Sequence, residues 1–161
     1  MKHIYTARWD LDDLSSALKI KKDNTLRFLR DGRNAAFLLK FYLSKITRMS
    51  LVEGHNAPTQ LIDDDGGVWV IKTCTEISGI SFCQNSMIGK GRRFNAVDFL
   101  KILKTYKGFL VCDVSAFPEA PIYEITSAKI KELYDHGALQ DGRMKYAVFK
   151  NIVNAEKKDA Q

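Results

Sequence analysis

The chain has 161 residues and a net charge of +6, with 45% hydrophobic and 27% charged residues. These proportions are those of an ordinary globular domain and exclude a wholly disordered chain. The apolar runs are far too short to cross a membrane, and Met1-Lys2-His3 begins no secretory signal, so we expect a cytoplasmic protein without a membrane partner. The positive charge favours an anionic partner, with nucleic acid first among the candidates.

Helices are expected in the first fifty residues. Residues 9–22 place apolar side chains on one helical stripe, with aspartates in the first turn and lysines in the last. A short helix over 25–30 follows, and Asn34 is predicted to open a third helix over 35–47. Residues 1–50 are therefore predicted to be a helical N-terminal part.

The rest of the chain alternates between strand-like and helical patterns. Strands are expected over 68–75, 80–84, 109–114, 122–126 and 144–149, and helices over 95–106 and 127–136. This order predicts an α/β fold, a mixed sheet flanked by helices, as a single domain over 1–161. The sheet part is predicted over 51–154, followed by a charged, frayed tail over 155–161.

The most informative stretch is 53–75. A polar, turn-prone segment leads to the acidic tip D-D-D-G-G at 63–67, and an apolar strand with one lysine, Lys72, follows. Asp and Gly ahead of a β-branched and aromatic run indicate a tight turn into a strand. A lysine inside such a strand lies either on a solvent-exposed face or in a site that uses its charge.

Carboxylates just upstream of Lys72 raise the possibility of a magnesium site. Mg²⁺ prefers hard oxygen ligands, and one or two carboxylates together with substrate phosphates suffice. Asp63 and Asp65 are the candidate ligands, and a lysine beside such a metal can hold a phosphate or polarise the attacking water. The competing interpretation is an ordinary hairpin turn, which residue preference alone favours for this run.

A glycine-rich, basic segment over 85–95 is interpreted as a functional loop. Its spacing does not match that of a P-loop, so nucleotide hydrolysis is not predicted. Amides such as those of Gln84 and Asn85 pair with adenine, and arginines suit guanine or phosphate. The alternatives are a plain strand residue and a solvated basic turn. The residues assigned here to nucleic-acid contact are His55, Asn56, Gln84, Asn85, Ser86, Lys90, Arg92, Arg93 and Asn95.

The order helix, polar turn, acid, glycine, strand ending in x-x-K, loop and strand resembles the PD-(D/E)xK nuclease superfamily. The closer likeness is to the PvuII-type restriction endonucleases. It rests on E-G-H-N-A-P-T-Q (53–60), G-V-W-V-I-K-T (67–73), the segment from Tyr106 to Ile125, and Asp31-Gly32 ahead of Leu38-Leu39, which is similar to the subunit-association helix. The resemblance implies a restriction-endonuclease-like fold, duplex DNA as ligand, and a homodimer.

The catalytic positions depart from that family. The family's first aspartate falls on Gln60 and its strand glutamate on Val70, and only Lys72 is retained. Two hypotheses follow. In one, Asp63 or Asp65 together with Glu76 supplies displaced carboxylates, and the protein is an Mg²⁺-dependent endonuclease. In the other, a nuclease-like domain of prokaryotic or phage origin binds double-stranded DNA without cleaving it.

Overall fold

The structure is a computed structural model that describes residues 1–52, 59–84, 87 and 93–159. In chain order, its elements are β1 (Lys2–Arg8), α1 (Leu11–Leu18), α2 (Lys22–Arg30), α3 (Gly32–Thr47), β2 (Ser50–Leu51), β3 (Gln60–Ile62), β4 (Val68–Cys74), β5 (Ile80–Ser81), α4 (Ala96–Thr105), β6 (Gly108–Asp113), the 3-10 helix η2 (Val114–Ala116), β7 (Glu119–Thr126), α5 (Ser127–Asp135), β8 (Arg143–Met144) and α6 (Tyr146–Asp159). None of these helices is long and apolar enough to cross a membrane.

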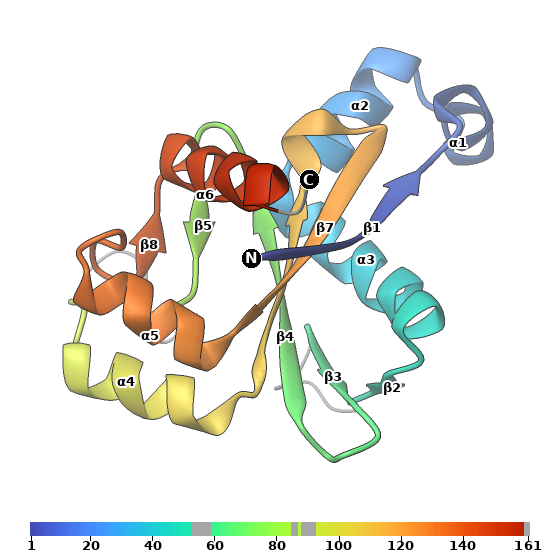
Figure 1. The fold of residues 1–161 in the computed structure, drawn as a ribbon. Helices are drawn as coiled ribbons and strands as arrows, with labels where there is room; N and C mark the ends of the chain where they lie inside the picture. Colours follow the sequence, from blue (N-terminus) through green and yellow to red (C-terminus); the bar gives the residue numbers. More distant parts are fainter. Residues whose placement is uncertain (53–58, 85–86, 88–92, 160–161) are drawn as a thin grey trace.

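Six strands form one curled sheet in the order β1-β7-β6-β4-β3-β2, and β5 and β8 form a separate two-stranded sheet. The central pair, β4 and β6, is parallel, and the other neighbours in the main sheet are antiparallel. Figure 1 shows helices on both sides of the main sheet. The predicted α/β fold with a mixed sheet flanked by helices is confirmed.

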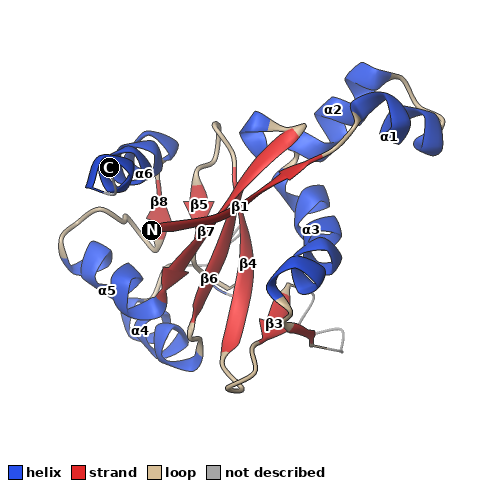
Figure 2. Ribbon diagram, turned by 45° about the vertical axis from the view of Figure 1, so that its right-hand side comes forward, coloured by secondary structure: helices blue, strands red, loops and turns tan. Residues whose placement is uncertain are grey.

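Each face of the main sheet carries its own hydrophobic core, because successive strand residues point to opposite faces. On one face, α3 packs Leu39 and Leu43 against Trp69 and Ile71 of β4. On the other face, α4, α5 and α6 pack against a second cluster that includes Val70. Figure 2 shows α3 on one side of the strands and the other three helices opposite. Strand β4 therefore has two buried faces.

The end of the chain differs from the sequence prediction. The predicted strand over 144–149 is wrong, because β8 ends at Met144 and α6 begins at Tyr146. Phe149 and Val153 are four residues apart and both are buried, which is helical spacing. A short aromatic and β-branched run is compatible with the period of a strand and with that of a helix, and its packing favours the helix. Residues 155–159, predicted to fray, belong to this helix.

The N-terminal part also differs, since it is not wholly helical. β1 pairs with β7 along the edge of the main sheet, with a register shift between His3 and Tyr5. The predicted strand over 80–84 is shortened to β5. The helix predicted to open at Asn34 is capped instead by Asp31, and the helix predicted over 127–136 is capped by Thr126. Both side chains accept from backbone N–H groups.

Candidate functional site

A groove of about 800 Å³ opens where the carboxyl end of β4 meets the junction of α2 and α3. We call it the cationic groove. Among the described residues, its lining includes one acid, Asp31, and four basic residues from four different elements: Arg30, Arg33, Lys72 and Arg143. The green loop from β4 to β5, at the top of Figure 1, forms part of its wall. Positive charge drawn together in a concave site attracts anions.

The close approach of α3 to β4 shapes one wall of the groove. The hydroxyl of Thr73 donates to the carbonyl of Gly32 at 3.1 Å. A Cβ at position 32 would lie 2.5 Å from that hydroxyl oxygen, so only glycine allows this contact without a shift. The Asp31 carboxylate accepts from the backbone N–H of Arg33 at 3.0 Å and caps α3. The sequence D-G-R therefore fixes the helix start beside the strand.

Asp31, the one acid among the described residues of the lining, is already paired with an arginine. Asp31 forms an ion pair with Arg33 at 3.2 Å, and this guanidinium lowers the pKa of the carboxyl group. Arg30 donates to the carbonyl of Phe117 at 3.0 Å, which holds its side chain in place. Arg30 and Lys72 thus have only neutral acceptors among their described hydrogen bonds. The groove keeps an excess of positive charge.

Lys72 is the most unusual of these cations, because it is partly buried. Its ammonium donates to the carbonyl oxygen of Cys83 at 2.7 Å. Burial lowers the pKa of Lys72 to about 8, since the charged form loses hydration. A lysine ammonium has three donors, and the described residues satisfy one of them with a neutral acceptor. An anion that binds beside this ammonium would stabilise its charged form.

The three catalytic positions implied by the resemblance do lie together. Gln60 faces Val70 across β3 and β4, and Lys72 follows two residues later on the same face of β4. Val70 is 6% exposed and belongs to the core. The side-chain amides of Gln60 and Gln84 both donate to the hydroxyl of Tyr106, at 3.3 and 2.8 Å. This arrangement supplies an amide, an aliphatic group and an ammonium.

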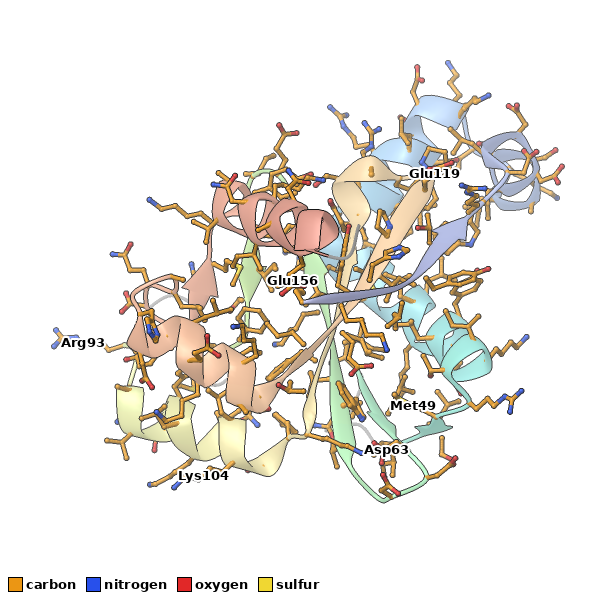
Figure 3. The ribbon with its side chains drawn as sticks, in the orientation of Figure 1. Met49, Asp63, Arg93, Lys104, Glu119 and Glu156 are labelled. Carbon is orange, nitrogen blue, oxygen red and sulfur yellow. The ribbon has the colours of Figure 1, made fainter. Side chains whose placement is uncertain are left out.

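The predicted metal ligands Asp63 and Asp65 lie at the other end of β4. Figure 3 shows Asp63 at the β3–β4 hairpin, at the opposite end of the sheet from the cationic groove. Lys107 pairs with both carboxylates, at 2.6 and 3.1 Å, and the indole of Trp69 donates to Asp63 at 2.8 Å. Lys107 and Trp69 lower the pKa of Asp63 to about 2. Asp63 also accepts from the backbone N–H groups of Asp65 and Gly67, so these residues form the tight turn.

At the two positions to which the resemblance assigns carboxylates, Gln60 offers one amide oxygen and Val70 none, whereas Mg²⁺ prefers hard oxygen ligands such as carboxylates. Glu76, the third candidate acid, is exposed in the turn after β4. The part of the chain that the structure describes contains no group of three or more His, Cys, Asp or Glu side chains placed to hold a metal ion. Metal binding by Asp63, Asp65 and Glu76 stays a prediction, and Lys107 and Trp69 would have to release the two aspartates.

The residues predicted to contact nucleic acid are only partly described. His55, Asn56, Asn85, Ser86, Lys90 and Arg92 lie outside the described residues. Gln84 is exposed but engaged with Tyr106, and Arg93 points away from the body of the protein at the edge of Figure 3. Asn95, at the start of the helix predicted over 95–106, caps α4 by accepting from the N–H groups of Val97 and Asp98.

Three groove residues were missed by sequence reasoning. Arg30 and Arg33 flank the D-G pair that marks the helix junction, and they read as solvated charges on helix faces. Arg143 is the first residue of β8, far along the chain, and reaches the groove because β8 pairs with β5. The R-D-G-R pattern was a usable signal, because its residues share a helix junction next to an interior strand. No local pattern indicates Arg143.

A second buried polar cluster attaches α6 to the sheet. Asp113, the last residue of β6, is fully buried. It accepts from the Tyr146 hydroxyl at 3.2 Å and pairs with Lys150 at 3.5 Å. Burial raises the pKa of Tyr146 to about 12. Because Asp113 has a cation and donors of its own, this cluster is a structural anchor.

No protein-family model, curated protein or solved structure matches this chain.

Proposed function

We propose that this chain binds double-stranded DNA through the cationic groove, as a nuclease-like domain that has no carboxylates at its catalytic positions. The observation that carries the proposal is the convergence of Arg30, Arg33, Lys72 and Arg143 on one groove with a single, already paired acid. Phosphate contacts from lysine and arginine supply most of the affinity in non-specific DNA binding.

The order of elements supports the resemblance to PvuII-type restriction endonucleases. Helix α3, the acidic turn, β4 with Lys72, and the later strands β6 and β7 occur in the order that the resemblance requires. The position corresponding to the family's aspartate faces the position of its glutamate across two strands. The restriction-endonuclease-like fold is part of this proposal, as is action in the cytoplasm of a prokaryotic cell.

Binding without hydrolysis is the form of the function that these residues favour. A metal-dependent nuclease needs acids within reach of its lysine, and Gln60 and Val70 carry none. Lys72 would then hold a phosphate, and the Gln60–Tyr106–Gln84 hydrogen bonds would keep the neutral positions ordered. The rival hypothesis, Mg²⁺-dependent cleavage, needs Asp63, Asp65 or Glu76 to reach the same phosphate.

The test combines binding and cleavage. Purified protein should retard short duplexes in a gel, with affinity falling steeply between low and moderate salt because cations released from DNA drive binding. Supercoiled plasmid in Mg²⁺ or Mn²⁺ should stay intact. Absence of any salt-sensitive binding would refute the proposal. Discrete fragments that disappear in Lys72→Ala would instead establish a nuclease.

We propose further that the protein is a homodimer formed through its N-terminal helices. Several large apolar side chains on or beside α1, α2 and α3 are 41–50% exposed, namely Leu18, Ile20, Phe28, Leu38 and Phe41. Apolar side chains gathered on one part of a surface commonly mark an interface. Analytical ultracentrifugation should give twice the monomer mass, and Phe28→Glu with Leu38→Glu should give the monomer. A wild-type monomer at micromolar concentration would contradict this.

A further inference from the structure

Ile77 stands out among the exposed apolar residues. Its side chain is 100% exposed, whereas the other large exposed apolar residues reach at most 62%. It occupies the turn between β4 and β5 and lines the mouth of the cationic groove. Single exposed apolar residues are common. Ile77 differs from them because a rigid turn presents it beside a concentration of positive charge.

The turn that carries Ile77 is tightly bonded. Thr75 and Gly79 exchange backbone hydrogen bonds, at 3.2 and 2.8 Å. The Thr75 and Ser78 hydroxyls lie 2.5 Å apart, and the Thr75 hydroxyl also accepts from the N–H of Ser78 at 3.1 Å. Gly79 has a φ of 63°, which favours glycine, and packs against β8. A preordered tip loses little conformational entropy on binding.

The groove places an apolar side chain near cations, which complements the apolar bases and the negative phosphates of DNA. Arg33 and Arg143 lie in the same groove lining as Ile77. Duplex DNA presents phosphates on its outside and apolar stacked bases between them. An aliphatic side chain that shares a groove with cations can enter between two base pairs while the cations contact phosphates, as apolar wedges of minor-groove proteins do.

We propose that Ile77 wedges between two stacked base pairs of a duplex held in the cationic groove, and that it is a specificity-determining residue. This inference rests on the proposed DNA binding. Because the wedge must unstack one base step, the protein prefers sites with a flexible pyrimidine–purine step over stiff A-tracts.

The experiment uses the full chain and two sets of duplexes, one with a central TA step and one with an A-tract, each with 2-aminopurine beside the central step. Wild-type protein should raise the 2-aminopurine fluorescence and bind the TA duplex about tenfold more tightly. Ile77→Ala should lose both effects while still binding the A-tract duplex with wild-type salt dependence. Ile77→Leu should restore the fluorescence.

Val97→Ala is the matched control, since Val97 is 62% exposed on α4 and does not line the groove. It should behave as wild type. The wedge is refuted if wild-type protein binds duplexes without a fluorescence change, or if Ile77→Ala keeps the change and the preference. A wild-type chain that binds no duplex refutes the proposed function, and the wedge falls with it.

Discussion

The two ends of β4 each have a lysine beside them, and the structure surrounds these lysines in opposite ways. At the hairpin end, Lys107 pairs with Asp63 and Asp65. At the groove end, Lys72 is partly buried and donates to one carbonyl oxygen. The pairing raises the pKa of Lys107, whereas burial lowers that of Lys72 to about 8.

The difference separates a structural cluster from a candidate binding site. In the hairpin cluster, Lys107 is paired with both Asp63 and Asp65. Asp63 also accepts the backbone hydrogen bonds that form the turn. The groove has more cations than acids, and a partly buried ammonium without a carboxylate costs stability that a structural role does not explain. Perturbed, under-partnered charges in a concavity are typical of functional sites.

The largest expected effect is on DNA affinity. Lys72→Met should weaken duplex binding by roughly tenfold to a hundredfold, because the neutral side chain removes a proposed phosphate contact in the groove. Lys107→Met should leave affinity within about twofold, since its charge is already paired. Fluorescence anisotropy titrations at fixed salt would measure both. Equal losses in the two variants would remove the distinction between the two ends.

Affinity should also depend on pH near the pKa of Lys72. Only the charged ammonium attracts a phosphate, so affinity should fall as pH rises through about 8. Between pH 7 and pH 9 we expect a loss of roughly three- to tenfold. Lys72→Arg keeps its charge in this range and should flatten the profile. A wild-type profile that is equally flat would contradict a role for the Lys72 charge.

Removing the Lys72 charge should stabilise the fold. Its folded-state pKa, about 8, lies below the ordinary value of 10.5, so folding a charged Lys72 carries a penalty below about pH 8. That penalty is relieved as pH rises from about 8 to 10.5, because the unfolded chain then binds more protons than the folded one. Urea unfolding at pH 7 should show Lys72→Met more stable by about 1–3 kcal/mol. A less stable variant would mean that Lys72 has a partner in the free protein.

The smallest effect is expected at the hairpin end. The folded-state pKa of Asp63, about 2, lies below its ordinary value of 3.8, so its contribution is present above about pH 4 and is lost as pH falls towards 2. Asp63→Asn should lower the melting temperature by a few degrees at pH 7 and leave DNA affinity unchanged. Its difference from wild type should shrink in acid. Loss of DNA binding in this variant would return Asp63 to the list of site residues.

Much of the local structure was predictable from the sequence, because turn and cap residues act over a few positions. The D-D-D-G-G run predicted the hairpin turn, Asn95 indicated the start of α4, and the apolar runs predicted β4, β6 and β7. The strand at 144–149 failed because a short apolar run is compatible with both periods until its neighbours are known. β1 was missed because its polar sequence becomes a strand only by pairing with β7.

For the site, the sequence by itself identified Lys72, since a cation inside an apolar strand is conspicuous without a structure. It also showed that the two positions to which the resemblance assigns carboxylates hold Gln60 and Val70. Only the tertiary structure decided that Asp63 and Asp65 pair with Lys107, and that Arg30, Arg33 and Arg143 line the same groove as Lys72. The physical reason is that cation–acid pairing and groove formation depend on which strand ends and helix ends meet in space. That meeting is set by sheet order and by helix packing, which bring residues as far apart in the chain as 33 and 143 to the lining of one groove.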